Sequence, residues 1–354
     1  MNESLLKKHF EAAPRMEPQD AVKLAFQSAF GCGHLLPGCE RCAAMIEKEI
    51  ERVPQADVPA ATSIGNGLCR LNLAAPEVRA LGAGMIGRMM LGTQERVETR
   101  GDSEERFAAS CQLIRTMAQR GEAPFSAEAF GAYWDAYEEK RRMDGGVVSH
   151  TQTYRDAYAP AYRVVLEDYA RLLPLLASRP KAAVFDGPCG SGKSTLAGLF
   201  AALHGTCPIP MDDFFLPPEM RTPERLAEPG GNVHRERFAA EVLHTLASDG
   251  PVRWQRFDCQ TGCMLPREQQ KGAVIVIEGS YSHHPAFNWK QFGAAKVFIS
   301  VDPAEQLRRI EKRSPDLLHM FETRWIPLEK NYFEAYDIRG NADFVIDNPR
   351  SSAY

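Results

Sequence analysis

The stretch that decides the fold reads Gly187-Pro-Cys-Gly-Ser-Gly-Lys-Ser-Thr195, which completes the phosphate-binding pattern G-x-x-x-x-G-K-S/T. A short apolar run, Ala182–Phe185, precedes it and predicts a strand, and the apolar-rich sequence that starts at Ser194 predicts a helix. Glycines let the backbone fold back so that its N–H groups point at one phosphate, and the positive end of the following helix favours the same anion. A chance match is the alternative, but it would not explain the flanking strand and helix. The stretch therefore predicts a nucleotide-binding loop.

Two side chains of this loop have chemical roles in the pattern. Lys193 can reach the β- and γ-phosphates, and the Ser194 hydroxyl can hold Mg²⁺. We expect nine residues to bind the nucleotide: Gly187, Pro188, Cys189, Gly190, Ser191, Gly192, Lys193, Ser194 and Thr195.

Length and composition narrow the class of protein. A chain of 354 residues is longer than one typical domain and predicts two. The net charge of -4, from 42 basic and 46 acidic residues, argues against a nucleic-acid-binding protein. No apolar run approaches the roughly 18 residues of a membrane span, and the first residues lack a signal peptide's long apolar stretch. Because nine cysteines, an odd number, are spread over a long chain, a reducing compartment fits better than a disulfide framework. We therefore expect a cytoplasmic protein that does not bind membranes.

The first part of the chain, residues 1–178, is predicted to be a mostly α-helical domain. Apolar residues recur there at helical spacing in four segments: Arg41–Arg52, Glu104–Gln119, Phe130–Arg142 and Tyr162–Leu176. The polar stretch Ser178-Arg-Pro-Lys181 predicts the joint between the two domains, so that the second domain covers residues 179–354.

The second part alternates strands and helices, which is typical of an α/β domain with a mainly parallel sheet. The predicted strands are Ala182–Phe185, Pro208–Met211, Val274–Ile277, Lys296–Ser300 and Ala342–Ile346. The predicted helices start at Ser194, His234 and Pro303. Ligands of such sheets bind at the carboxyl ends of the strands, so residues that follow each strand are the candidates for chemistry.

Acidic residues stand at two of these strand ends. Asp212 and Asp213 follow the second predicted strand, and Glu278 follows the third. Phosphoryl transfer needs charge neutralisation, Mg²⁺ and an oriented nucleophile. Ser194, Glu278 and Asp212 can position Mg²⁺, and an acid can accept the proton of an attacking hydroxyl. The alternative for the two aspartates is a turn or a helix cap.

Three arginines follow the fourth strand, and Arg309 and Arg313 share a helix face because four residues separate them. Their guanidinium groups could close over the phosphates as a lid. Alternatively, Arg308 and Arg309 pair with Glu305 or Glu311 on a solvated face.

With these residues in view, residues 180–350 resemble the uridine kinase and phosphoribulokinase group of P-loop kinases. The resemblance rests on six segments: Gly187–Thr195, Asp212-Asp-Phe-Phe215, Ile277-Glu-Gly279, Val301-Asp-Pro303, Arg324–Phe333 and Ala342-Asp-Phe-Val-Ile-Asp347. It implies ATP and Mg²⁺ as cofactors and transfer of the γ-phosphate to an alcohol of a small molecule, with a nucleoside as the leading acceptor. It also implies that Asp212 activates the hydroxyl. The His-Pro-Asp-Ala wording usual in uridine kinases is absent from this chain.

The segment between Phe215 and Val274, together with the residues after Glu278, should supply the contacts to the acceptor. The candidates are Asp213, Phe215, His234, Arg237, Tyr281 and His283, with Arg235, Arg256, Asp258 and His284 beside them. Each of these could instead be an ordinary surface or core residue. We expect a small-molecule partner, and a homo-oligomer is compatible with these features.

The role of residues 1–178 stays open at this stage. Four side chains that could bind zinc lie within eleven positions: Cys32, His34, Cys39 and Cys42. They either bind zinc or are incidental residues of a turn. The unusual Cys-x-His spacing favours the turn. A second group of polar residues forms either a polar site or caps that hold helix ends in place, and the structural role is favoured. The group consists of Asp20, Gln27, His34, His150 and Arg155. Two alternatives to a simple kinase therefore remain, an ATP-binding switch that controls residues 1–178 and a bifunctional enzyme.

Overall fold

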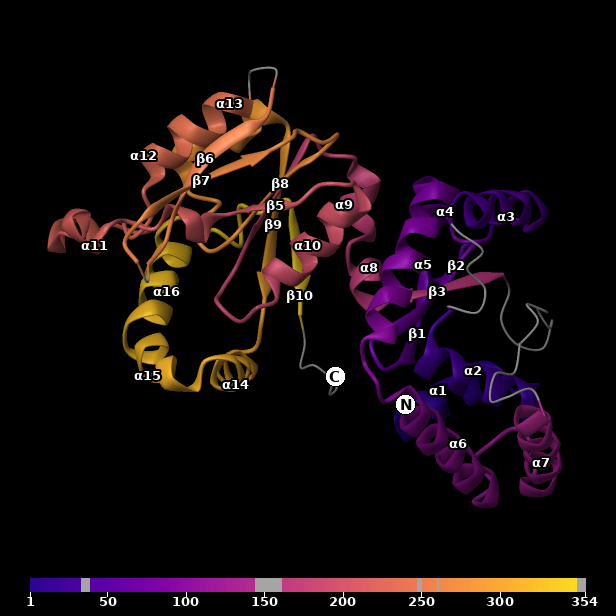
Figure 1. Ribbon diagram of the computed structural model, residues 1–354. Coiled ribbons are helices and arrows are strands. Elements are labelled where there is room, and N and C mark those ends of the chain that lie inside the picture. The colour runs from indigo at the N-terminus through magenta and orange to yellow at the C-terminus, as the bar shows by residue number, and fades with distance from the viewer. Residues whose placement is uncertain (33–38, 144–160, 247–249, 260, 349–354) are drawn as a thin grey trace. The chain divides into compact units, whose positions relative to one another are not determined.

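The computed structural model describes residues 1–32, 39–143, 161–246, 250–259 and 261–348 (Figure 1). These residues group into two units, one spanning Met1–Leu173 and one that begins at Pro174. Within the described residues, no helix combines the length and the apolar composition needed to cross a bilayer.

The first unit is built mainly from helices. They are α1 Glu3–Ala12, α2 Pro18–Phe30, α3 Cys39–Arg52, α4 Pro76–Leu81, α5 Ala83–Glu98, α6 Ser103–Gln119, α7 Ala127–Met143 and α8 Glu167–Arg171. The helices predicted over 41–52, 104–119 and 130–142 are confirmed as α3, α6 and α7. A small antiparallel sheet of β1 Ala61–Gly65, β2 Leu68–Asn72 and β3 Tyr162–Leu166 completes this unit.

The helix predicted over Tyr162–Leu176 is wrong in its first third. Tyr162–Leu166 is strand β3, which pairs with β2 and is buried at all five positions. A fully buried strand is apolar on both faces, so its sequence also satisfies a helical pattern. The chain becomes helical only afterwards, in α8 and in α9 Leu173–Ser178.

The turn of the β1–β2 hairpin explains why asparagine and glycine stand at positions 66 and 67. Asn66 and Gly67 form the two-residue turn and have φ angles of 54° and 69°, which a type I′ turn requires at both positions. Asparagine and glycine tolerate these angles best, so the turn sets the register of the hairpin.

The second unit has the α/β architecture that the sequence predicts. Five of its strands are β4 Ala182–Asp186, β5 Pro208–Pro210, β8 Ile275–Glu278, β9 Ala294–Ser300 and β10 Phe344–Asp347. They form one sheet in the order β10-β9-β4-β8-β5, and every neighbouring pair is parallel. All five predicted strands are confirmed. Because β4 lies in the middle, the segment that follows it stands at the centre of the sheet's carboxyl edge.

Helices connect these strands. α10 Lys193–Leu203 follows β4, α14 Pro303–Arg313 follows β9, and α16 Ile326–Ala335 precedes β10. Between β5 and β8 the chain forms the short helices α11 Pro223–Ala227, α12 Arg235–Phe238 and α13 His244–Leu246, with a π-helical turn Ala239–Leu243 before α13. A second π-helical turn, Phe321–Trp325, links α15 Leu318–Met320 to α16.

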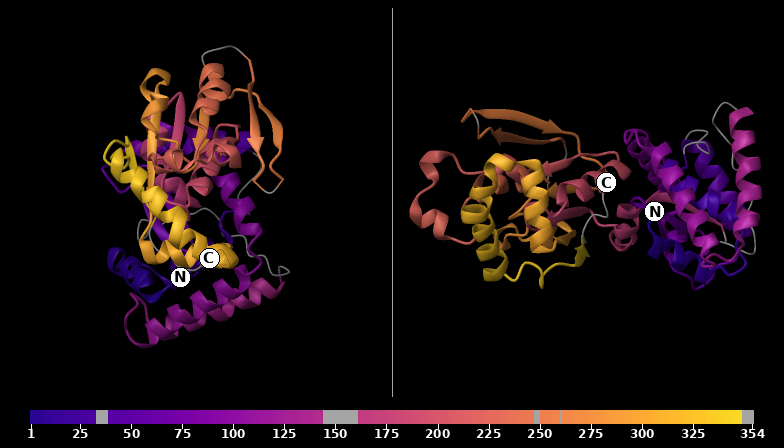
Figure 2. Two further views of the ribbon diagram at one scale, coloured as in Figure 1. Left: turned by 90° about the vertical axis from the view of Figure 1, so that its left-hand side faces the viewer. Right: turned by 90° about the horizontal axis from the view of Figure 1, so that it is seen from below.

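A two-stranded ribbon, β6 Val252–Phe257 and β7 Met264–Gln269, stands apart from the parallel sheet (Figure 2). The sequence analysis did not predict it. Strand β6 alternates between buried and exposed residues, with Val252, Trp254 and Phe257 buried, and it packs on the core through Val252 and Trp254. Strand β7 is exposed along nearly its whole length, which explains why it lacks an apolar pattern.

Candidate active site

The predicted nucleotide-binding loop connects β4 to α10 and has a backbone that only glycine adopts easily. Gly187, Gly190 and Gly192 have φ angles of 145°, 74° and 93°. A Cβ atom on Gly187 would lie 2.2 Å from the carbonyl oxygen of Ile299 in β9. The tight passage beside β9 therefore requires glycine at the start of the loop.

The lysine of the loop lies across it. Lys193 begins α10, has an exposed fraction of only 9%, and donates from Nζ to the carbonyl oxygen of Pro188 at 3.3 Å. The ammonium group and the amino end of an eleven-residue helix therefore converge on the loop. Both carry positive charge, so an anion is favoured there.

The hydroxyl and the carboxylate expected to hold Mg²⁺ are adjacent in the structure. Ser194 Oγ donates to Glu278 Oε2 at 2.8 Å. The contact follows from the sheet, because β4 and β8 are neighbours and Phe185 pairs with Glu278. Burial raises the pKa of Glu278, and Asp212 and Asp213 add to this, whereas the bond from Ser194 and the charge of Lys193 lower it.

The two aspartates after β5 have different surroundings. Asp212 is exposed, and within the described part of the chain its carboxylate has no hydrogen-bond or ion-pair partner. Asp213 is buried, accepts a bond from the Trp254 indole at 2.7 Å, and lies 3.8 Å from Arg256. Burial raises the pKa of Asp213, although Trp254 and Arg256 lower it. Asp212 is thus the acid that is open to a ligand.

A buried carboxylate that the sequence analysis missed holds the loop from below. Asp186, the last residue of β4, accepts from the backbone N–H groups of Gly187, Tyr281 and His283 at 2.7, 3.2 and 2.8 Å, and from the Tyr332 hydroxyl at 2.9 Å. It is fully buried, and burial raises its pKa to about 6. Its position at the end of the predicted strand, directly before the loop, was the available signal.

A second missed carboxylate reaches the loop from α16. Glu329 has an exposed fraction of 5%, and both of its oxygens accept from the Cys189 backbone N–H, at 3.1 and 2.9 Å. The Ser280 hydroxyl donates to Glu329 Oε1 at 2.6 Å. We call Asp186, Ser280, Glu329 and Tyr332 the support cluster, because they tie the loop, the segment after β8 and α16 together. No local sequence pattern predicts that Glu329 contacts the loop.

The three arginines on α14 have different contacts. Arg309 donates to the carbonyl oxygens of Gly190 and Ser191, at 3.2 and 3.3 Å, and also to Glu305. Arg308 pairs with Glu305, as the structural alternative had it. Arg313 is exposed and lies over the ring of Phe321. Only Arg309 contacts the loop.

Most of the predicted acceptor contacts have structural partners. Arg237 donates to the carbonyl oxygen of Asp213 at 2.6 Å and lies over Phe214. His234 caps α12 by accepting from the Arg237 N–H at 3.3 Å. Phe215 is half-buried against the core.

Two other predicted contacts lie in the interior. Tyr281 has an exposed fraction of 4%. His283 is equally enclosed, and its Nε2 lies 2.8 Å from the carbonyl oxygen of Val184. Burial lowers the pKa of His283 to about 4, which keeps the ring neutral. Because these side chains are buried beneath the site, we do not expect them to contact a ligand directly.

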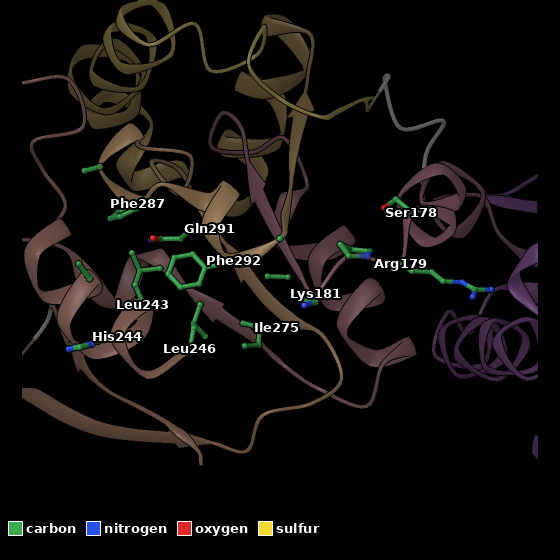
Figure 3. A pocket seen from close by; sticks show the side chains of 15 residues that line it. Ser178, Arg179, Lys181, Leu243, His244, Leu246, Ile275, Phe287, Gln291 and Phe292 are labelled. Carbon is green, nitrogen blue, oxygen red and sulfur yellow. The ribbon is translucent and has the colours of Figure 1, made fainter. Parts of the chain in front are cut away.

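A cavity of about 980 Å³ lies at the opposite edge of the sheet (Figure 3). Its lining includes the first residues of three strands or the residues just before them, Lys181, Ile275 and Gly293, together with Leu243 and Phe292. Because the phosphate loop follows the carboxyl end of β4, this cavity is separate from the candidate active site.

In the first unit, the described residues include only part of each predicted group. Cys32 and Cys42 are buried, while His34 and the side chain of Cys39 lie outside the described residues. Among the residues that the structure describes, no group of three or more His, Cys, Asp or Glu could hold a metal ion.

The predicted polar patch is partly visible. Gln27 accepts from Arg70 at 2.8 Å and donates to the Tyr162 hydroxyl at 3.0 Å, and Asp20 caps α2 by accepting from the Glu17 N–H at 2.9 Å. His150 and Arg155 lie outside the described residues.

No known family profile matches this chain, and no curated protein sequence matches it. Among solved structures, it is similar to a protein described as a possible uridine kinase from Bacillus stearothermophilus, with 21% identity and a TM-score of 0.40 over 51% of this chain and 100% of that chain. It is also similar to a protein described provisionally as a fructose transport system kinase from Silicibacter sp. TM1040, with 24% identity and a TM-score of 0.34 over 47% of this chain and 89% of that chain. These likenesses are remote and extend over about half of this chain.

Proposed function

We propose that the second unit is an ATP-dependent phosphotransferase that moves the γ-phosphate of ATP to an alcohol group of a small molecule. The observation that carries this proposal is the contact of 2.8 Å between Ser194 and Glu278 at the phosphate loop. Asp212 follows the neighbouring strand β5; it is exposed and has no hydrogen-bond or ion-pair partner among the described residues. A hydroxyl, a carboxylate and a free acid beside one phosphate site are the groups that phosphoryl transfer uses.

The loop supplies the binding of the phosphates. Its backbone N–H groups, the amino end of α10 and the Lys193 ammonium group offset the negative charge of ATP. During transfer, negative charge spreads over the equatorial oxygens of the γ-phosphoryl group and develops on the leaving oxygen of ADP, so the same groups also stabilise the transition state.

Mg²⁺ suits the oxygen ligands of this site. Ser194 and Glu278 would hold it, because hydroxyl and carboxylate oxygens are the hard donors that Mg²⁺ prefers. Glu278 is half-buried among other carboxylates, which raises its pKa, and a cation would relieve that cost. When bound, Mg²⁺ neutralises charge on the phosphate oxygens.

Asp212 is the proposed general base. The alcohol's O–H bond breaks and its proton passes to the Asp212 carboxylate, while its oxygen bonds to the γ-phosphorus and ADP leaves with the bridging oxygen. Asp213 is less suited to this step, because Trp254 already occupies one of its oxygens at 2.7 Å. Arg237 supports the step indirectly by holding the backbone of Asp213 at 2.6 Å.

The test is ADP release from Mg²⁺-ATP with a panel of acceptors: nucleosides, nicotinamide riboside, pantothenate, ribulose 5-phosphate and simple sugars. We expect release that depends on one class of acceptor and disappears in Lys193→Ala. ATP binding without acceptor-stimulated release would overturn the proposal and favour a nucleotide-controlled switch.

A further inference from the structure

The two faces of the β6–β7 ribbon differ in charge balance. Trp254 lies opposite Arg267 across the ribbon, and Arg256 lies two residues further along β6, so these three side chains share one face. This is the face toward Asp213, since Trp254 donates to Asp213 and Arg256 lies beside it. Arg253 and Glu268 lie opposite each other on the other face and form an ion pair of 2.8 Å.

Within the described residues, the positive charge of the face toward Asp213 is only partly balanced, by the carboxylate of Asp213. Arg256 Nε lies 3.8 Å from Asp213 Oδ1, which is too long for a hydrogen bond, and its side chain is 45% exposed. Arg267 is exposed and has no hydrogen-bond or ion-pair partner within the described part of the chain. Two guanidinium groups therefore share one carboxylate, which also serves Trp254.

These arginines border the proposed site of transfer. Both act on the carboxylate of Asp213, which is next to the proposed base Asp212. Asp212 and Asp213 in turn both act on Glu278, the carboxylate bonded to Ser194 of the phosphate loop. The two arginines therefore act on the same group of carboxylates that contains the proposed base.

We propose that the acceptor carries an anionic group, a phosphate or a carboxylate, besides its reactive alcohol, and that Arg256 and Arg267 bind this group. The inference rests on the proposed kinase function and narrows it. Guanidinium groups match both oxyanions through paired N–H donors. A neutral nucleoside would offer these guanidinium groups no anionic partner beyond the Asp213 carboxylate that they share.

The experiment uses matched acceptors that differ in the anionic group: ribulose with ribulose 5-phosphate, glycerol with glycerol 3-phosphate, and pantothenol with pantothenate. Each is tested with the full chain for ADP release and, separately, for thermal stabilisation of the protein. The variants are Arg256→Ala, Arg267→Ala and the matched control Arg253→Ala, which removes an arginine of the same ribbon from its other face.

We expect the charged member of at least one pair to be the better acceptor and the better stabiliser. Loss of either arginine should raise its KM by about ten- to a hundredfold, the range of one charge-assisted hydrogen bond, and leave kcat nearly unchanged. Arg253→Ala should behave like the parent chain. The phosphate and carboxylate pairs separate the two sources of negative charge.

Two failures remain distinguishable. Transfer to neutral acceptors with a KM that neither arginine affects would overturn the anionic acceptor and leave the kinase function intact. Absence of transfer to every acceptor would contradict the kinase function. In that case the thermal measurement still tests the anion site. Stabilisation of the parent chain by the charged compounds that is lost in both arginine variants supports the site. Equal stabilisation of the parent chain and of both variants overturns it.

Discussion

The support cluster and the open rim of the phosphate loop both contain carboxylates, but these differ in burial and in hydrogen bonding. The open rim consists of Ser194, Asp212 and Glu278. Asp186 in the support cluster is fully buried and accepts four hydrogen bonds. Asp212 on the rim is exposed and unpartnered in the described part of the chain. The first carboxylate satisfies buried donors and fixes the backbone, while the second keeps its lone pairs for a ligand.

The difference suggests a division of labour. A buried polar group contributes to stability only when all of its bonds are made, so changes in the support cluster should appear first in unfolding measurements. An exposed acid contributes little to stability, so changes on the rim should appear first in catalysis. The following predictions test this comparison, from the largest effect to the smallest.

Replacing the rim acid by Asp212→Asn should separate the two regions most clearly. We expect kcat to fall by about 10²- to 10⁴-fold because the general base is lost. ATP binding and the free energy of unfolding should stay within about 0.5 kcal/mol of the parent chain, because the residue is exposed. Steady-state kinetics, ATP titration and urea unfolding measure the three quantities. Asp316→Asn, another exposed acid, is the control, and a matching loss of ATP binding would contradict the assigned role.

Asp186 should make stability depend on pH. Its pKa rises from 3.8 to about 6 on folding, so between these values the native state binds more protons than the unfolded state. The contribution of Asp186 to the free energy of unfolding should therefore decrease as the pH rises from about 4 to about 6, by on the order of 3 kcal/mol. Asp186→Asn cannot titrate, so its pH profile from denaturant unfolding should lack this decrease. Parallel profiles for the two proteins would refute the prediction.

Truncating the second buried carboxylate by Glu329→Ala should lower the free energy of unfolding by about 1–3 kcal/mol, since the Cys189 N–H and the Ser280 hydroxyl lose their acceptor in a buried site. Glu329→Gln retains one acceptor oxygen and should lose less. We also expect a higher KM for ATP in Glu329→Ala, because the loop is less well held. Urea unfolding and ATP-dependent kinetics test both points, and equal stability of the two variants would argue against a supporting role.

The smallest effects should come from α14. Arg309→Ala loses two contacts to loop carbonyl oxygens and should weaken ATP binding by a few-fold, which is about 1 kcal/mol. Arg313→Ala removes only an exposed contact with Phe321 and should change ATP affinity and stability by less than about 0.5 kcal/mol. ATP titrations of the two variants provide the comparison. Equal weakening by both would instead support a lid formed by the two arginines together.

Local patterns predicted the sheet of the second unit well but failed elsewhere. Buried parallel strands are short apolar runs, and Ile275–Glu278 is such a run that ends at an acid of the candidate site. Tyr162–Leu166 is also mostly apolar apart from Arg163, but leucines follow it, so a helical pattern fitted it as well. Strand β7 was missed because its residues are exposed and carry no alternation.

The sequence by itself determined the phosphate loop, the five strands around it and the acids at their carboxyl ends, because these features depend on neighbouring residues along the chain. Only the tertiary structure decided which of those acids is free and which is buried. It also decided that Glu329, 140 residues away from Cys189, holds the loop, and that the charge of Arg267 acts on Asp213. The physical reason is that burial and hydrogen-bond partners arise from packing between distant segments, which a local pattern does not record.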